Sequence, residues 1–325
     1  MSEKKLTGAM TERPARRGKV RCLELVMRKP LKIGRSYSVA LSPDQTRLAA
    51  LGRFIFVWDL QLGKNVLRCQ PFSHPSHASF SPSGKVIAVK NTPGRIVIVD
   101  ADDGDTVADF QNQSDGEGSN LTYSACGDFV VDGSWAGWLR VRQSSDGKTV
   151  FEEQFPHEMI RAVHRDASNQ RWIVEHQPKV RPSEKFAPPA YFSLWEWPFR
   201  TKTFSVLPYR IGLLCSSALS TDGRHLALVR RDTSTVLEVC GVPSETPLWT
   251  APISVSGTGS ALSWSPDGSL LASVQEKKIA VYRVPGLSRI AEFALEYPAD
   301  IAFCPMFKSV ELAYWQQGLV APVEW

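Results

Sequence analysis

Short apolar runs alternate with turn residues along most of the sequence. The runs are rich in β-branched and aromatic residues and are bounded by turn residues, which is typical of strands. No stretch shows the sustained apolar spacing of an amphipathic helix. The pattern therefore predicts an all-β fold, with clear strands at Arg47–Leu51, Phe54–Trp58, Val86–Val89, Ile96–Val99, Leu226–Val229 and Ile279–Tyr282.

The strands recur in a unit that begins with a turn of the Ser-Pro-Asp-Gly type. In this turn, proline fixes φ, and Asp and Gly accept the dihedral angles that reverse the chain. Successive turns are 39 to 45 residues apart, except for one interval of 56, and their mean spacing of about 44 residues matches a four-stranded propeller blade. The turns lie at Ser42-Pro43, Ser81-Pro82, Ser124-Ala125, His164–Asp166, Ser220–Gly223, Ser265-Pro266 and Cys304-Pro305.

One third strand ends in Trp58-Asp59, and with the repeat period this motif makes the chain resemble the WD-repeat β-propeller family from about Val20 onwards. The resemblance implies a seven-bladed β-propeller of four-stranded antiparallel blades. No other third strand ends in Trp-Asp, and the family's Gly-His pair before the first strand is missing. The family's buried His-Ser-Asp-Trp hydrogen-bond network therefore cannot be assigned to any blade, so blade stability is expected to rest on apolar packing.

The two ends of the chain are expected to meet in the last blade. The final repeat ends at its third strand, Gly318–Trp325, and so lacks a fourth strand. Val20–Lys29 is predicted to be a lone strand that supplies this missing edge and closes the ring. The expected domains are a mobile basic leader, residues 1–19, and a single propeller, residues 20–325.

Composition favours a soluble cytoplasmic protein. Of the 325 residues, 43% are hydrophobic and 22% are charged, and the net charge is only +5. The six cysteines are scattered without a Cys-x-x-Cys pair, which is typical of buried thiols in a reducing compartment. No apolar segment has the length of a secretory signal or of a membrane span.

Motifs for catalysis, cofactors or metals are missing from the sequence, and we expect none of these sites. His74 and His77 lie three apart without an evident third metal ligand. Asp100–Asp105 superficially resembles a Ca²⁺ loop, but its glycine is one place too early and no glutamate stands at position twelve. We interpret it as an ordinary turn.

A protein-binding face is predicted from the charges of the loops. In the family geometry, loops between second and third strands share a face with the loops that lead into each first strand. The loops between second and third strands carry ten basic and three acidic residues. The turns on the opposite face are rich in aspartate, which is also favoured in such turns for local reasons. Tryptophan with arginine is typical of protein-binding hot spots. The predicted contact residues are Arg53, Lys90, Arg95, Trp135, Lys179, Arg181, Lys185, Phe186, Arg230, Arg231, Lys277, Lys278 and Trp315.

The long interval contains a proline-rich insertion, residues 177–190, between the second and third strands of the fourth blade. It is predicted to lie on the same face, either as a contact loop or as a neutral insertion. The favoured function is a non-enzymatic scaffold for an acidic protein or peptide, as a complex subunit or as a toxin-neutralising immunity protein. The alternatives are a propeller enzyme of the hydrolase or lactonase type and a nucleic-acid-binding propeller. The oligomeric state is left open.

Overall fold

The computed structural model describes residues 31–32, 38–110, 118–168, 170–179, 190–199, 204–211, 213–231, 234–242, 247–254, 261–275, 278–294, 300–304, 311–316 and 319–321. For 31–32, 204–211, 213–215, 293–294 and 300–321 within these ranges, the description covers the backbone alone. The predicted leader, residues 1–19, and the predicted strand Val20–Lys29 lie outside the described residues.

Six antiparallel sheets, blades 1 to 6, are each built from four strands that follow one another in the chain. Blade 1 contains β2 (Ser38–Leu41), β3 (Arg47–Leu51), β4 (Ile55–Asp59) and β5 (Lys64–Cys69). Blade 2 contains β6 (Pro75–Phe80), β7 (Val86–Asn91), β8 (Ile96–Asp100) and β9 (Thr106–Phe110). Blade 3 contains β10 (Leu121–Tyr123), β11 (Phe129–Gly133), β12 (Trp138–Gln143) and β13 (Thr149–Gln154).

The second half of the chain repeats this arrangement. Blade 4 contains β14 (Glu158–Arg165), β15 (Arg171–Pro178), β16 (Ala190–Glu196) and β17 (Phe204–Ile211). Blade 5 contains β18 (Leu213–Leu219), β19 (His225–Arg231), β20 (Thr235–Gly241) and β21 (Pro247–Pro252). Blade 6 contains β22 (Leu262–Trp264), β23 (Leu270–Gln275), β24 (Lys278–Arg283) and β25 (Ser288–Ala294).

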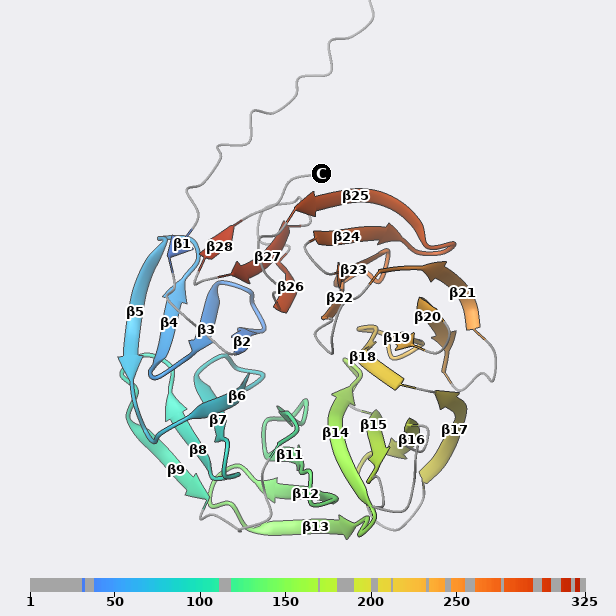
Figure 1. Ribbon diagram of the computed structural model, residues 1–325. Helices are drawn as coiled ribbons and strands as arrows, with labels where there is room; N and C mark the ends of the chain where they lie inside the picture. The colour runs from blue at the N-terminus through green and yellow to red at the C-terminus, as the bar shows by residue number, and fades with distance from the viewer. Residues whose placement is uncertain are drawn as a thin grey trace, which may run out of the picture.

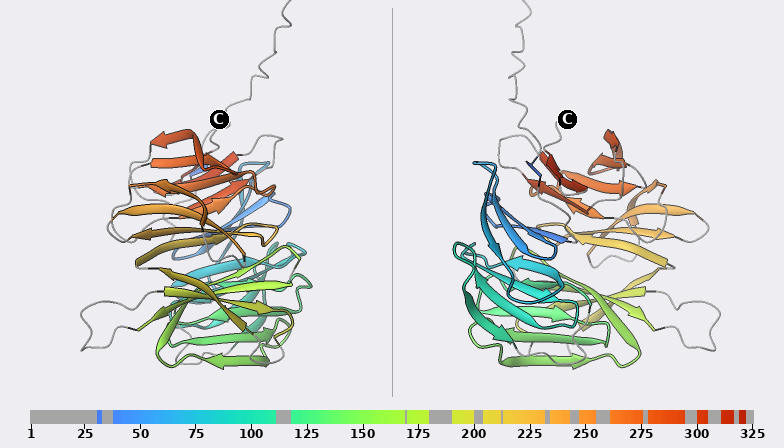
Figure 2. Two further views of the ribbon diagram at one scale, coloured as in Figure 1. Left: turned by 90° about the vertical axis from the view of Figure 1, so that its right-hand side faces the viewer. Right: turned by 60° about the vertical axis from the view of Figure 1, so that its left-hand side comes forward.

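The blades lie around a common centre, with the first strand of each blade innermost and the fourth strand outermost (Figure 1). The side views show strands running from one face of the molecule to the other, so successive connections alternate between two faces (Figure 2). The predicted β-propeller architecture of four-stranded antiparallel blades is therefore confirmed.

A further four-stranded sheet combines the two ends of the chain and is called the terminal sheet below. It contains β26 (Asp300–Cys304), β27 (Glu311–Gln316), β28 (Leu319–Ala321) and β1 (Leu31–Lys32), in the order β1-β28-β27-β26. Leu31 pairs with Val320 and Lys32 pairs with Leu319. The pairing strand thus lies just after Val20–Lys29, the segment predicted to close the ring. The innermost strand of the terminal sheet, β26, lies beside both β22 and β2.

The serine turns lie where the sequence predicts, apart from the one in blade 4, and the serine side chain fixes them. In blade 6, the Ser265 amide donates to the Leu270 carbonyl at 2.9 Å, and the Ser265 hydroxyl oxygen accepts from the Leu270 amide at 2.9 Å. The same hydroxyl donates to Asp267 at 2.6 Å, so one side chain fixes both ends of the turn. In blade 4, Asp166 takes this place, because its carboxylate accepts from the amides of Gln170 and Arg171. The repeat spacing that starts this turn at His164 puts His164 in the serine place, so the predicted position was wrong by two residues.

Apolar packing between blades forms the core. Leu51 and Ile55 of blade 1 form one cluster with Ile87 and Val89 of blade 2, and all four side chains are fully buried. Comparable clusters join blade 2 to blade 3, blade 3 to blade 4, blade 4 to blade 5 and blade 5 to blade 6. Each blade consequently contributes apolar residues from both faces of its sheet, as expected for sheets packed face to face.

The outermost strands share a β-bulge. In five blades, one residue of the fourth strand is skipped in its pairing with the third strand, so that the ladder is interrupted at the same place. The skipped residue is aliphatic and exposed in every case, which places it away from the interblade core. These residues are Val66, Val107, Val150, Leu248 and Ile290.

Candidate functional site

The predicted sorting of the loops between two faces agrees with the backbone hydrogen bonds. The amide of Thr92, between second and third strands, donates to the carbonyl of His74, which precedes a first strand. The amide of Lys179 likewise donates to the carbonyl of His157, and that of Phe155 donates to Gly137. Loops between second and third strands therefore share one face, called the loop face below, with the loops that lead into first strands.

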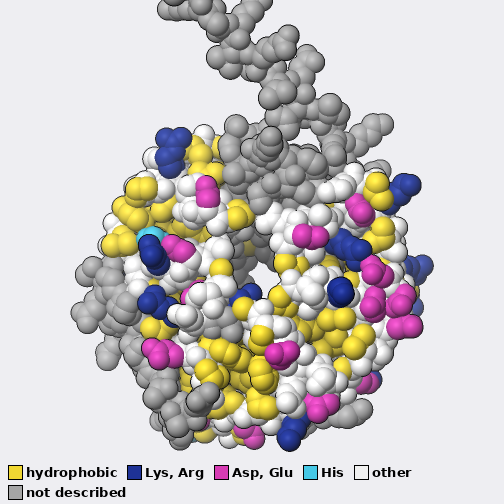
Figure 3. Space-filling view, turned by 180° about the vertical axis from the view of Figure 1, so that it is seen from behind, with side chains coloured by type: hydrophobic (Ala, Val, Ile, Leu, Met, Phe, Trp, Pro, Cys, Tyr) yellow, Lys and Arg dark blue, Asp and Glu magenta, His cyan; other side chains and the backbone are white. Residues whose placement is uncertain are grey.

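The opposite face carries the remaining turns. Seen from behind, the molecule is hollowed at its centre, and acidic side chains gather over blades 1 and 2 (Figure 3). Asp102, Asp103 and Asp105 are exposed in the turn after β8. Asp100 accepts the Asp102 amide at 2.7 Å, and this segment is a turn between the third and fourth strands, as the sequence predicts. Many of these aspartates thus serve their own turns.

Much of the predicted positive charge of the loop face is neutralised within the chain. Arg95 forms an ion pair with Asp109, and Arg230 lies 2.8 Å from Glu238. The Lys278 ammonium lies 3.0 Å from Glu292. These carboxylates stand on third and fourth strands, which the loop-based charge count omitted. Arg231 is half-buried at the end of β19.

Arg53, Trp135 and Lys179 are the predicted contact residues that are exposed in the described part of the chain. The Lys179 ammonium makes only long contacts with the carbonyls of Ala136 and Pro156, at 3.5 and 3.4 Å. Trp315 lies in β27 rather than in an exposed loop, and its side chain is outside the described atoms. The predicted contact residues Arg181, Lys185, Phe186 and Lys277 lie outside the described residues.

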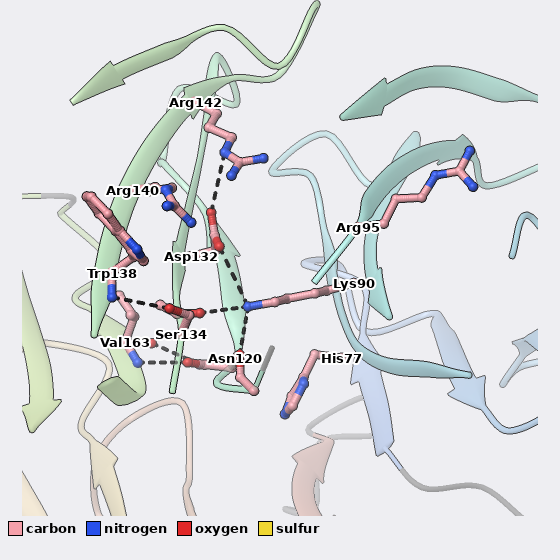
Figure 4. Close-up of polar contacts among 12 residues, drawn as sticks. His77, Lys90, Arg95, Asn120, Asp132, Ser134, Trp138, Arg140, Arg142 and Val163 are labelled. Atoms are coloured by element: carbon pink, nitrogen blue, oxygen red, sulfur yellow. Dashed lines mark hydrogen bonds and ion pairs between the residues drawn. The ribbon is translucent and has the colours of Figure 1, made fainter. Parts of the chain in front are cut away.

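Lys90 is not on the surface, which corrects its assignment as a contact residue. Its side chain is fully buried on β7 and reaches into the interface with blade 3 (Figure 4). The ammonium donates to the carbonyls of Gly118 at 2.7 Å and Gly133 at 2.6 Å, and it lies 3.6 Å from the Asp132 carboxylate. Burial lowers the pKa of Lys90, and Asp132 acts in the opposite direction.

Asp132 belongs to a larger group of buried charges on blade 3. Arg142 lies 3.8 Å from Asp132, and Arg140 lies 3.4 Å from Glu152 and 4.4 Å from the Trp138 ring centroid. Arg95, by contrast, points away from this group (Figure 4). Buried charges require partners because desolvation is costly, so this group joins blades 2 and 3 and fixes their relative position.

The Lys90 hydrogen bonds hold the loop that carries Trp135. Gly133 ends β11 directly before Ser134 and Trp135, and Gly118 lies beneath the Trp135 ring, where an added Cβ would clash with the indole. The Ser134 carbonyl also accepts the Ile160 amide of blade 4 at 2.9 Å. Trp135 is nevertheless 50% exposed. The result is a solvent-facing aromatic side chain on a loop fixed from two neighbouring blades.

Blade 4 contains a hydrogen-bond chain that the sequence analysis missed. The Trp195 indole donates to Ser193 at 2.7 Å, and Ser193 bonds with His176 Nε2 at 2.6 Å. His176 Nδ1 lies 2.9 Å from Glu158, which also accepts from the Tyr191 hydroxyl. Burial opposes ionisation of Glu158, but the hydrogen bonds from His176 and Tyr191 lower its pKa overall. These hydrogen bonds join β14, β15 and β16 within the blade.

A second polar group joins blades 4 and 5 near the centre. Ser217 donates to Glu175 at 2.5 Å and lies 2.8 Å from His164 Nε2, while Arg161 lies 3.4 Å from Glu175. Burial raises the pKa of Glu175 and lowers the pKa of His164 to about 4. Because Ser217 donates its proton to Glu175, His164 acts as a hydrogen-bond donor to Ser217.

The described residues contain no group of three or more side chains suited to holding a metal ion. The same residues include no helix long and apolar enough to cross a membrane.

Replacement of Lys90 with Met is expected to lower the free energy of unfolding by about 3 kcal/mol, because Asp132 and two carbonyls lose their buried partner. Urea unfolding measures this loss. The environment of Trp135 is expected to change as well. The emission of Trp135 is obtained as the difference between K90M and K90M/W135F, and it should be shifted relative to the difference between the wild type and W135F. The exposed Lys85→Met variant is the control, and equal stability of K90M and K85M would contradict this role of Lys90.

Stability is expected to fall as the pH drops from about 6.5 towards 4, because His164 has a folded pKa of about 4, below the ordinary value of about 6.5. In that range, the unfolded chain binds a proton at His164 that the folded chain does not. His77, also with a pKa of about 4, acts in the same direction. The free energy of unfolding of H164Q, measured from pH 7 to 4, should depend less steeply on pH than that of the wild type. An unchanged slope would refute this effect.

Comparison with known proteins identifies the fold. No family model and no curated protein matches the sequence. Among solved structures, hydrazine synthase from Kuenenia stuttgartiensis aligns with a TM-score of 0.71 and 11% identity, covering 93% of this chain and 98% of that one. The β-propeller domain of Cps50 (Swd1) from Myceliophteria thermophila aligns with a TM-score of 0.71 and 11% identity, covering 91% and 98%. At such low identity, these similarities show a β-propeller fold and nothing more specific.

Proposed function

We propose that the chain is a cytoplasmic, non-enzymatic protein-interaction module that binds an acidic protein or peptide through its loop face. The observation that carries this proposal is Trp135, a half-exposed tryptophan on a loop fixed by Lys90 and by blade 4. An aromatic side chain that is already ordered loses little conformational entropy on binding, which is why such residues often dominate interfaces.

The preference for an acidic partner rests on fewer cations than the sequence suggests. Arg53 and Lys179 are exposed without a described carboxylate partner, and Lys179 lies beside Ala136, the residue after Trp135. Arg95, Arg230 and Lys278 have carboxylates of their own. The attraction is therefore local to a few positions, and screening by salt should weaken it.

The enzyme alternative would act through Ser217, where a carboxylate and an imidazole converge. Acyl transfer by serine requires the hydroxyl to donate its proton to the base histidine. Here Ser217 donates to Glu175 instead, and Glu175 is buried between two blades. This geometry favours a bridge between blades 4 and 5 over a nucleophile, so we favour the binding module.

The proposed fold of the chain is a divergent WD-repeat propeller with seven blades. In it, the terminal sheet is the seventh blade, and β1 closes the ring as the outer strand of that blade. Support comes from the pairing of β1 with β28 and from the position of β26 beside β22 and β2.

Replacement of Trp135 with Ala is expected to weaken partner binding at least tenfold while leaving the melting temperature nearly unchanged, because half of the side chain is in solvent. Affinity capture from native lysate at low and high salt, followed by titration of the captured protein, measures this. Leu248→Ala, an exposed aliphatic change on an outer strand, is the matched control. Equal affinity of W135A and L248A would disprove the assignment of the loop face.

Deletion of residues 1–32 should lower the melting temperature by several degrees, because it removes the strand that pairs with β28. Deletion of residues 1–19 is the control and should leave the melting temperature unchanged. Differential scanning calorimetry compares the two. Identical melting temperatures would argue against closure by β1.

A further inference from the structure

Blade 1 carries two arginines that share one aromatic ring on the loop face. Arg68, on β5, places its guanidinium carbon 3.9 Å from the centroid of Phe54, and Arg53 places its own at 5.6 Å from the same centroid. Arg68 pairs across the sheet with Phe56, so its side chain runs along the sheet surface towards the Phe54 ring. Both arginines are exposed, and Phe54 is half-buried.

Neither arginine has a carboxylate within ion-pair distance among the described residues. This distinguishes them from Arg95, Arg230 and Lys278 on the same face, whose charges are matched by acids. Two positive groups held near one ring repel each other, and no described carboxylate pairs with either of them. Apart from Lys179, the uncompensated charge of the loop face among the described residues is therefore concentrated at this pair.

Stacking on an aromatic ring uses the face of a guanidinium and leaves its N–H groups directed outward in the plane. Those groups form a fork that matches the paired oxygens of carboxylates and phosphates. A phosphate monoester carries a charge of about −1.5 to −2 at neutral pH and offers three oxygens, whereas a carboxylate or a nucleic-acid diester carries one charge. Two unpaired arginines match the dianion best.

We propose that Arg53, Arg68 and Phe54 form a binding site for a phosphate monoester on a phosphorylated peptide. The inference rests on the proposed function, since it names the anionic group that the loop face binds on its partner. Arg68 presents a fixed fork because Phe54 orients it, and Arg53 supplies the second charge.

The test compares the affinities of three probes by isothermal titration calorimetry at low salt: inorganic phosphate, a short phosphoserine peptide and the same peptide with glutamate. The phosphoserine peptide is expected to bind about tenfold tighter than the glutamate peptide. R53Q and R68Q should each weaken it about tenfold, and R68K should also weaken it because lysine lacks the stacked fork. R95Q, the same change at a paired arginine, should have no effect.

Binding of inorganic phosphate without binding of the phosphoserine peptide would overturn the peptide as the source of the phosphate. Equal binding of both peptides, or of the wild type and R53Q/R68Q, would overturn the site. So would tighter binding of duplex DNA through the same two arginines. Retention of the captured protein partner by R53Q/R68Q would overturn this inference alone, whereas loss of capture in W135A is the outcome on which the proposed function depends.

Discussion

Every blade of this propeller has to bury both faces of its sheet against neighbouring sheets. The second strands show this most directly, because successive residues such as Leu48 and Ala49, or Ile87 and Ala88, are all fully buried although they point to opposite faces. Burial of apolar area is the main favourable term, and it is gained only when the neighbouring blade is present. Any polar residue in these strands must therefore find its partner within the interface.

Lys90 and Glu175 show how this constraint is met. They occupy equivalent positions, because Lys90 pairs with His77 and Glu175 with Ala162, next to the same irregularity in the first strand. Lys90 reaches two carbonyls of blade 3, and Glu175 reaches Ser217 of blade 5. A lysine in blade 2 and a glutamate in blade 4 thus do the same thing at the same position: each binds its own blade to the next one. On blade 3 the same contacts fix the loop of Trp135, so the packing constraint also orders the binding face.

The sequence predicted the repeat well because it is local. The serine turns have specific residue requirements, and at Ser42, Ser220 and Ser265 the serine hydroxyl donates to the aspartate of the turn. The degenerate turn was misplaced because Asp166 can do the work of serine. Burial of Lys90 was missed because a lysine near a strand end was read as a loop residue. Its spacing of two from Ala88, which faces the core, was the available signal. The carboxylates that pair with Arg95 and Arg230 could not be found from loop composition, since cross-strand pairing decides them.

The bulges of the outer strands also matter during synthesis, before all blades are present. While the chain is being synthesised, each blade emerges with its fourth strand as an open edge, and a regular open edge is a template for pairing with another chain. The interruption at Val66, Val107, Val150, Leu248 and Ile290 breaks the ladder that an incoming strand would have to match. These five blades therefore each carry their own protection against misassembly between nascent chains.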